Sequence, residues 1–209
     1  MLAVNVSRQL TMKIQLEKYN PDWKTIYKNI EDDLRRSLAF VNPIIEHIGS
    51  TSIFDLTAKP IIDILVGIPK HEQLDKIVEP LTSNDYIFYE KYNLTMPYRR
   101  FFVKLKTKPD FFIPKIYCEK DEVPNELNDY KLAHIHILEY NSYHWTRHVA
   151  FREYLKKNVA VKNEYQKIKL QLSILDWRDG NEYNDAKNDF IKRIEKKALE
   201  WYAKQNSSN

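Results

Sequence analysis

The chain has 209 residues and a net charge of +4, with 43% hydrophobic and 30% charged residues, a composition typical of a globular domain with a sizeable core. Its three glycines are too few for a glycine-rich phosphate loop or a dinucleotide-binding fingerprint. The single cysteine excludes an internal disulfide and a multi-cysteine zinc site, and indicates a reducing cytoplasm. No apolar run is long enough to span a membrane, so we expect a cytoplasmic protein without a membrane partner.

The first half of the chain predicts short strands and helices in alternation. Pro21 begins a helix whose apolar residues, from Trp23 to Leu38, recur at helical spacing and should face the core. The last strand of this half is almost continuous in Ile, Leu and Val, which predicts burial on both faces. The predicted strands are residues 12–17, Ile44–Ile48 and 60–68, with one or two helical turns over 53–58 and an amphipathic helix over 70–81.

A polar loop between the second and third of these strands carries the first candidate site. Gly49 lets the backbone approach a ligand closely, and the hydroxyls of Ser50 and Ser52 suit phosphate oxygens at a helix start. Asp63 places a carboxylate inside an apolar strand, which is costly unless it is paired or binds a cation. Alone, such features are more often an ordinary turn or a hydrogen-bonded residue. Together they favour a nucleotide phosphate and its metal held side by side.

Aromatic and β-branched residues predict three further strands in the middle of the chain. Within them, Arg99 and Arg100 are adjacent and should point to opposite faces of a sheet. Either could reach a phosphate, although a solvated charge on an edge strand is the simpler interpretation for each. The three strands are expected over residues 86–92, 99–106 and 110–118.

Residues 132–138 predict another strand, in which two isoleucines alternate with two histidines. The alternation that buries the isoleucines places His134 and His136 together on the opposite face. This is reasonable spacing for two metal ligands, and two surface histidines are the alternative. Beyond residue 141 only helices are predicted, over Tyr143–Lys157 with Ser142 as its N-cap, over 161–175, and over about 182–202.

Several segments together resemble one family. They are EHIGSTS at 46–52, AKPIIDI at 58–64, AHIHI at 133–137, RHVAFREYL at 147–155, the spacing from Tyr165 to Lys169, and RDGNEYNDAKNDFI at 178–191. They look like the GrpB family, a branch of the nucleotidyltransferase superfamily, and the resemblance extends over about residues 12–201. It implies an α+β fold: a nucleotidyltransferase-like mixed β-sheet with flanking helices and a C-terminal helical region. We expect a single domain over 1–209, with this core at about 12–140 and a helical extension at about 141–204.

The implied function is nucleotidyl transfer, or nucleotide binding, with a divalent metal (Mg, Mn or Zn), a nucleoside triphosphate as substrate and an unknown acceptor. The expected partner is a nucleotide or another phosphorylated small molecule, with RNA also allowed. The chain departs from the superfamily pattern at Leu65, where a second carboxylate is usual, and at Phe54-Asp55, where relatives tend to have Pro-Gly. Because a lone Asp is poorly suited to two-metal chemistry, the alternative is a catalytically inactive nucleotide-, RNA- or protein-binding module on the same fold.

The predicted site combines these residues by role. Asp63, His134 and His136 are the expected metal ligands, and Asp63 and His136 are the expected catalytic residues. Positive side chains elsewhere in the chain are candidates to neutralise phosphate. The predicted nucleotide- and phosphate-binding residues are Gly49, Ser50, Ser52, Lys59, Arg100, Arg147 and Arg152.

Overall fold

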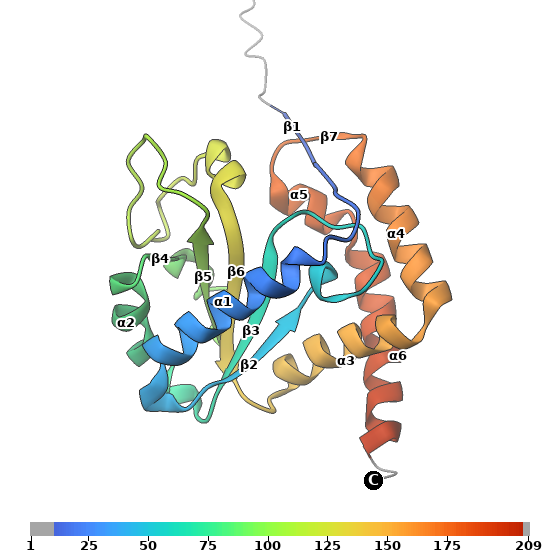
Figure 1. The fold of residues 1–209 in the computed structure, drawn as a ribbon, viewed down its shortest axis with the longest axis horizontal. Helices are drawn as coiled ribbons and strands as arrows, with labels where there is room; N and C mark the ends of the chain where they lie inside the picture. Colours follow the sequence, from blue (N-terminus) through green and yellow to red (C-terminus); the bar gives the residue numbers. More distant parts are fainter. Residues whose placement is uncertain (1–10, 207–209) are drawn as a thin grey trace, which may run out of the picture.

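The centre of the structure, a computed structural model, is a five-stranded mixed sheet with the strand order β2-β3-β6-β5-β4 (Figure 1). The pair β3 and β6 is parallel, and the other three neighbouring pairs are antiparallel. The strands are β2 (Ile44–Ile48), β3 (Ile62–Ile68), β4 (Tyr86–Phe88), β5 (Arg99–Leu105) and β6 (Lys131–Glu139). The structure describes residues 11–206, so the ends of the predicted domain, 1–10 and 207–209, lie outside the described residues.

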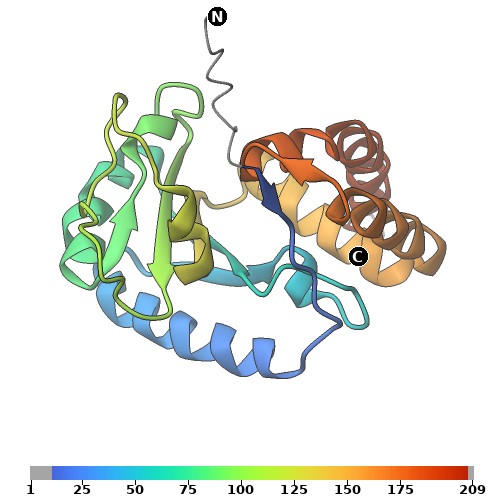
Figure 2. The same ribbon diagram turned by 90° about the horizontal axis from the view of Figure 1, so that it is seen from above.

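One face of the sheet is apolar and packs against helix α1 (Asp22–Ser37) (Figure 2). The predicted apolar stripe of this helix is confirmed, since Trp23 and Leu34 are buried in the same cluster as Ile64 and Ile135 of the sheet. Full burial of one such aliphatic side chain contributes about 1.5–3 kcal/mol. The alternation in β6 therefore fixes which face takes the isoleucines, and leaves the histidines on the other.

The C-terminal helical region covers the β2-β3-β6 part of the opposite face, and residues between Tyr89 and Leu127 cover the β4-β5 part. Trp145 and Val149 pack on Leu65 and Leu138 of that face, and the backbone N–H of Trp145 donates to the Ser142 hydroxyl, which confirms the predicted N-cap. A second, two-stranded sheet pairs β1 (Met12–Lys13) with β7 (Asp176–Trp177). The helices are α3 (Tyr143–Lys157), α4 (Val159–Ser173), α5 (Gly180–Asp185) and α6 (Asn188–Asn206).

Several predicted elements are shorter than expected or absent. The segment 70–81 forms two 3₁₀ turns before helix α2 (Val78–Ser83), because Pro80 lacks the N–H that would continue a helix back to residue 76. The predicted strand 110–118 makes only one bridge, between Ile116 and Phe88, since prolines interrupt its hydrogen bonding. The residues of 86–92 beyond β4 and of 12–17 beyond β1 are not strand either.

The loop after β2 also differs from its prediction. The helical turn expected over 53–58 lies earlier, as a 3₁₀ turn over Ser50–Ser52, and the helix expected over 182–202 is divided into α5 and α6. The expected fold class, α+β with a mixed sheet, flanking helices and a C-terminal helical region, is confirmed. Within residues 11–206 no helix is long and apolar enough to cross a membrane.

Candidate functional site

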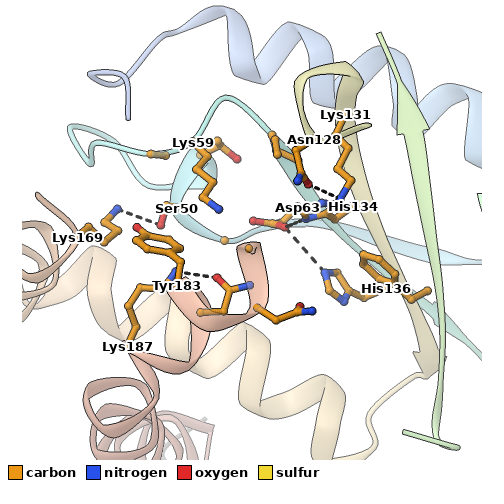
Figure 3. Close-up of a pocket in the computed structure, with 18 of the residues that line it drawn as sticks. Ser50, Lys59, Asp63, Asn128, Lys131, His134, His136, Lys169, Tyr183 and Lys187 are labelled. Carbon is orange, nitrogen blue, oxygen red and sulfur yellow. Dashed lines mark hydrogen bonds and ion pairs between the residues drawn. The ribbon is translucent and has the colours of Figure 1, made fainter. Parts of the chain in front are cut away.

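A cavity of about 400 Å³ lies between the histidine-bearing face of the sheet and the C-terminal helical region (Figure 3). Its wall draws on residues from Leu16 to Lys187, so that strands, loops and helices far apart in the chain all contribute. The volume is within the usual range for small-molecule sites. Asp63 lines it together with Gly49 and Ser50, as the strand–loop–strand pattern from 44 to 68 predicts, and His134 and His136 line it as well.

The loop after β2 fits closely against the carboxylate. Gly49 has φ 68° and ψ −173°, a conformation that is essentially restricted to glycine. A Cβ at this position would lie 2.2 Å from Oδ2 of Asp63. Glycine is therefore required here both by the backbone conformation and by the approach to Asp63. The sequence predicted that the backbone at Gly49 approaches a ligand closely, and in the structure it approaches the carboxylate of Asp63.

The carboxylate of Asp63 is held by the two histidines of β6. Its Oδ1 lies 3.3 Å from Nδ1 of His134 and 3.9 Å from Nε2 of His136. Burial would raise the pKa of the Asp63 carboxyl, but the contacts with both histidines outweigh it and hold that pKa below its ordinary value. Burial lowers the pKa of His136 to about 4 and also lowers that of His134. At neutral pH the site therefore contains an ionised carboxylate beside two neutral imidazoles.

Arg99 determines which nitrogen of His136 carries the proton. The guanidinium Nη1 lies 3.0 Å from Nδ1 of His136, and because a guanidinium only donates, Nδ1 must accept. The hydrogen of His136 is therefore on Nε2, which faces Asp63. Neither nitrogen is left with a free lone pair for a metal ion.

The expected metal site does not fit this arrangement. Within residues 11–206 no group of three His, Cys, Asp or Glu side chains could hold a metal ion. Asp63, His134 and His136 converge as predicted, but the Arg99 contact occupies the lone pair that His136 would need. The position of the missing second carboxylate, Leu65, is fully buried under α3 and does not open into the cavity.

Four lysines and one arginine surround the single carboxylate that lines the described cavity. The lysines are Lys59, Lys131, Lys169 and Lys187, and the arginine is Arg99. Burial lowers the pKa of Lys59 and Lys131 to about 8 and of Lys169 and Lys187 to about 7. Repulsion between neighbouring lysines adds to this effect. Without a ligand, this cavity holds more positive charge than its own acid can balance.

The structure does not place three of the predicted phosphate ligands in the cavity, because each of these arginines is paired elsewhere. Arg100 points to the other face of the sheet and binds Asp75 at 2.7 Å. Arg147 binds Glu195 at 2.7 Å. Arg152 is buried and donates at 2.7 Å both to Glu46 and to the backbone carbonyl of His47. These arginines join elements of the fold.

Ser52 is a fourth predicted phosphate ligand that lies outside the cavity. Its hydroxyl donates to the carbonyl oxygen of Gly49 at 2.7 Å and closes the 3₁₀ turn, so it does not line the cavity. Ser50 does line it, and its Oγ accepts from Nζ of Lys169 at 3.2 Å. Lys59 is the predicted cation that the structure does place in the cavity.

The cavity cations that sequence reasoning missed are Lys131, Lys169 and Lys187, and Arg99, which was considered as an alternative to Arg100, was left out of the predicted site. Two of them had a signal in the sequence. Lys169 lies one helical turn after Tyr165, and Lys187 lies in the 178–191 segment, both of which carried the family resemblance. Lys131 had none, since it is one lysine among many until the cavity is formed.

Fold and cavity together define an α+β protein in which a mixed sheet and a helical region enclose a cationic pocket. Residues 13–197 match the family model described as GrpB protein, so this chain belongs to the GrpB family. The glutamate-rich protein GrpB of Alkalihalophilus pseudofirmus is 27% identical over 198 residues, which cover 93% of this chain and 98% of that protein. The crystal structure of the conserved protein GrpB from Enterococcus faecalis matches with a TM-score of 0.69 at 29% identity, covering 90% of this chain and 99% of that one.

A further relative is longer than this chain. The UPF0157 protein YqkA of Bacillus subtilis is 29% identical over 199 residues, which cover 94% of this chain. The chain spans about half the length of YqkA, with 50% of that protein matched.

Proposed function

We propose that the cavity binds a nucleoside polyphosphate, whose phosphate charge is neutralised by lysine and arginine side chains. The observation that carries this is the excess of positive charge: Arg99 and four lysines line one cavity in which Asp63 is the only carboxylate that the described residues supply. A cavity lined by one sign of charge concentrates ligands of the opposite sign. An anionic ligand also restores the full charge of lysines whose pKa burial has lowered.

The end of the cavity near His136 suits a nucleoside. Phe101 lies 5.1 Å from the ring of His136 and 5.5 Å from that of Tyr89. Two buried polar groups there, the Tyr89 hydroxyl and Nε of Arg99, have no hydrogen-bond partner among residues 11–206. Aromatic faces with a few polar groups are the usual surroundings of a bound base. A phosphorylated ligand with an aromatic ring fits both the charge and the aromatic end.

Calorimetric titration with the four common nucleoside triphosphates, each without metal and with Mg²⁺, Mn²⁺ or Zn²⁺, tests this proposal. We expect saturable binding without a metal, because the cations belong to the protein. Lys131→Met should weaken binding about tenfold, the usual effect of losing one charged hydrogen bond. Lys108→Met, at an exposed lysine outside the cavity, should bind as the wild type does. Absence of binding, or strict metal dependence, would refute this view of the site.

Nucleotidyl transfer is the second candidate, and the ionised Asp63 beside the Gly49-Ser50 loop favours it. In such a reaction an acceptor hydroxyl oxygen attacks the α-phosphorus, the bond to the bridging oxygen breaks, and pyrophosphate leaves. Asp63 would take the hydroxyl proton, and the lysines would stabilise the charge that develops on the phosphates.

Pyrophosphate release separates a transferase from a binding module. The reaction would be run with a nucleoside triphosphate and, as acceptors, either the small molecules or the RNA of a bacterial extract. A transferase should release pyrophosphate with one of these acceptors, and Asp63→Asn should abolish release while the triphosphate still binds. Equal release by wild type and variant would exclude Asp63 as the base, and no release with any acceptor would favour the inactive binding module.

A further inference from the structure

We propose that Lys59, Lys169 and Lys187 form a subsite for the terminal phosphates of a di- or triphosphate, so that the protein selects polyphosphates over monophosphates. This inference rests on the proposed nucleotide binding and assigns the two ends of the ligand. Figure 3 shows Lys169 and Lys187 at the end of the cavity away from His136, with Asp63 between the two ends. The nucleoside would therefore lie near His136, and the phosphates would extend toward the helical region.

Two of these lysines flank the same ring. Nζ of Lys187 lies 4.1 Å and Nζ of Lys59 lies 4.5 Å from the centroid of Tyr183. Each ammonium gains from the negative face of the ring, yet the two like charges repel each other. Nζ of Lys187 also donates to Oδ1 of Asn184 at 3.0 Å. Neutral partners hold the two charges close together without cancelling them.

The third lysine is the most buried of the group. Lys169 is 2% exposed, lies 4.8 Å over the ring of Tyr165, and donates to the Ser50 hydroxyl and the Thr57 carbonyl oxygen. These partners are also neutral. Within residues 11–206 none of the three lysines forms an ion pair with a carboxylate.

The arginines of the same region differ from these three lysines, because the arginines have carboxylate partners. The half-buried Arg147 and the buried Arg152 are each paired with a glutamate at 2.7 Å, as is usual for cations removed from water. A buried cation without a counter-ion is costly, so three lysines without carboxylate partners around one end of a cavity favour an anion of more than one charge, which would restore their full charge. Orthophosphate and a nucleoside monophosphate supply less charge and less length than a diphosphate or triphosphate does.

The subsite also joins two parts of the fold. Lys59 belongs to the loop before β3, Lys169 to α4, and Lys187 to the connection between α5 and α6. A polyphosphate bound among them would hold the helical region against the sheet. Its binding should therefore slow backbone hydrogen exchange in α5, which supplies Tyr183, and not in the distant α2.

The test compares inorganic triphosphate, pyrophosphate and orthophosphate, followed by the tri-, di- and monophosphate forms of one nucleoside, all by calorimetry. We expect triphosphate to bind at least about tenfold more tightly than orthophosphate, with the same order among the nucleotides. Lys187→Met and Lys169→Met should each reduce this preference at least about tenfold. Lys167→Met, an exposed lysine on the same helix as Lys169, should leave the preference unchanged. Circular dichroism and a cooperative urea transition establish that each variant is folded. Lys59→Met changes the second lysine that lies over the Tyr183 ring and should reduce the preference in the same way.

The possible failures of the two proposals differ. If the nucleoside mono- and triphosphates bind equally well, the subsite is refuted while nucleotide binding stands. If inorganic triphosphate binds but no nucleotide does, the subsite stands and the nucleoside end is refuted. If the lysine variants retain the full preference for triphosphate, the phosphates lie elsewhere and the subsite is refuted.

Discussion

The two faces of the central sheet differ in whether the charged side chains beside them have partners of opposite charge. On the face under α1, the charged groups at the margin are paired: Asp33 accepts from both the Tyr86 hydroxyl and Lys104 at 2.7 Å, and Arg100 binds Asp75. On the other face, lysines with neutral partners surround a cavity. Paired charges stabilise the fold, whereas unpaired ones cost folding free energy that a ligand can recover. The difference separates a face made for stability from a face made for binding.

The largest expected change in stability is for a substitution at Gly49, on the cavity side of the sheet. Gly49→Ala combines an unfavourable backbone conformation with a clash against Asp63, and should lower the free energy of unfolding by about 3 kcal/mol or more. Gly180→Ala is the control, since a Cβ there meets nothing within 4 Å. Urea denaturation measures both. A change below about 1 kcal/mol at Gly49 would mean that the loop can move away from Asp63.

The next largest effect is expected on the face under α1, where the charged groups are paired. Asp33→Asn weakens the contacts with Tyr86 and Lys104 and should lower the free energy of unfolding by about 1.5–3 kcal/mol, with triphosphate affinity unchanged. Asp32→Asn, which loses only a surface pair with Lys28, should change stability by less than about 0.5 kcal/mol. Weakened triphosphate binding in Asp33→Asn would show that the two faces are not independent.

The dependence of stability on pH also distinguishes the two faces. Lys169 and Lys187 have a pKa of about 7 in the folded protein, against about 10.4 when unfolded. The unfolded chain therefore binds more protons between these values, and the stability of the free protein should rise from pH 7 to pH 9. Saturation with inorganic triphosphate should abolish this rise, because the anion keeps both lysines charged.

Urea midpoints at several pH values, with and without inorganic triphosphate, test this linkage. Asp33 acts in a different window. Its pKa is lowered by Lys104 and Tyr86 against the opposing effect of burial, so its contribution is lost only as the pH falls below about 4. A free protein whose stability is flat or falling between pH 7 and 9 would show that the cavity lysines keep their ordinary pKa.

The smallest expected effect is at Asp63. Asp63→Asn removes the negative charge that repels a bound polyphosphate, but it also removes the attraction that keeps Lys59 and Lys187 protonated. Because these changes oppose each other, affinity for inorganic triphosphate should rise only about threefold. Calorimetry at constant ionic strength measures it. A loss of affinity would instead make Asp63 necessary for holding the lysines charged.

Sequence patterns predicted the sheet well and the cavity in part. Alternation placed His134 and His136 on one face, and the strand–loop–strand pattern brought Asp63 to Gly49 and Ser50, because both depend on local periodicity. The choice between Arg99 and Arg100 depended on the register of β5 against β6, and a shift by one residue would exchange their faces. Register is a tertiary property, so the sequence could not decide it.

The cavity lysines could not be predicted for a similar reason. Lys169 and Lys187 meet Ser50 and Lys59 only after two helices fold back on the sheet. Arg147 and Arg152 looked equally suited to phosphate, and what distinguishes them is the presence of a glutamate in space. Whether a positive side chain is paired or available depends on distant residues that no local pattern includes.

The span of the cavity wall along the chain also sets the order in which the molecule can be made. The parallel pair β3 and β6 can form once residue 139 is available, but Lys187 follows 48 residues later. At a synthesis rate of about 5–20 residues per second, that delay is about 2–10 s. In the first part of this interval, until α3 ends at Lys157, Leu65 and Leu138 lack the covering helix that Trp145 and Val149 provide. A nascent chain would then expose an apolar sheet face without any means of binding its ligand, which makes this interval the one in which aggregation or chaperone capture is most favoured.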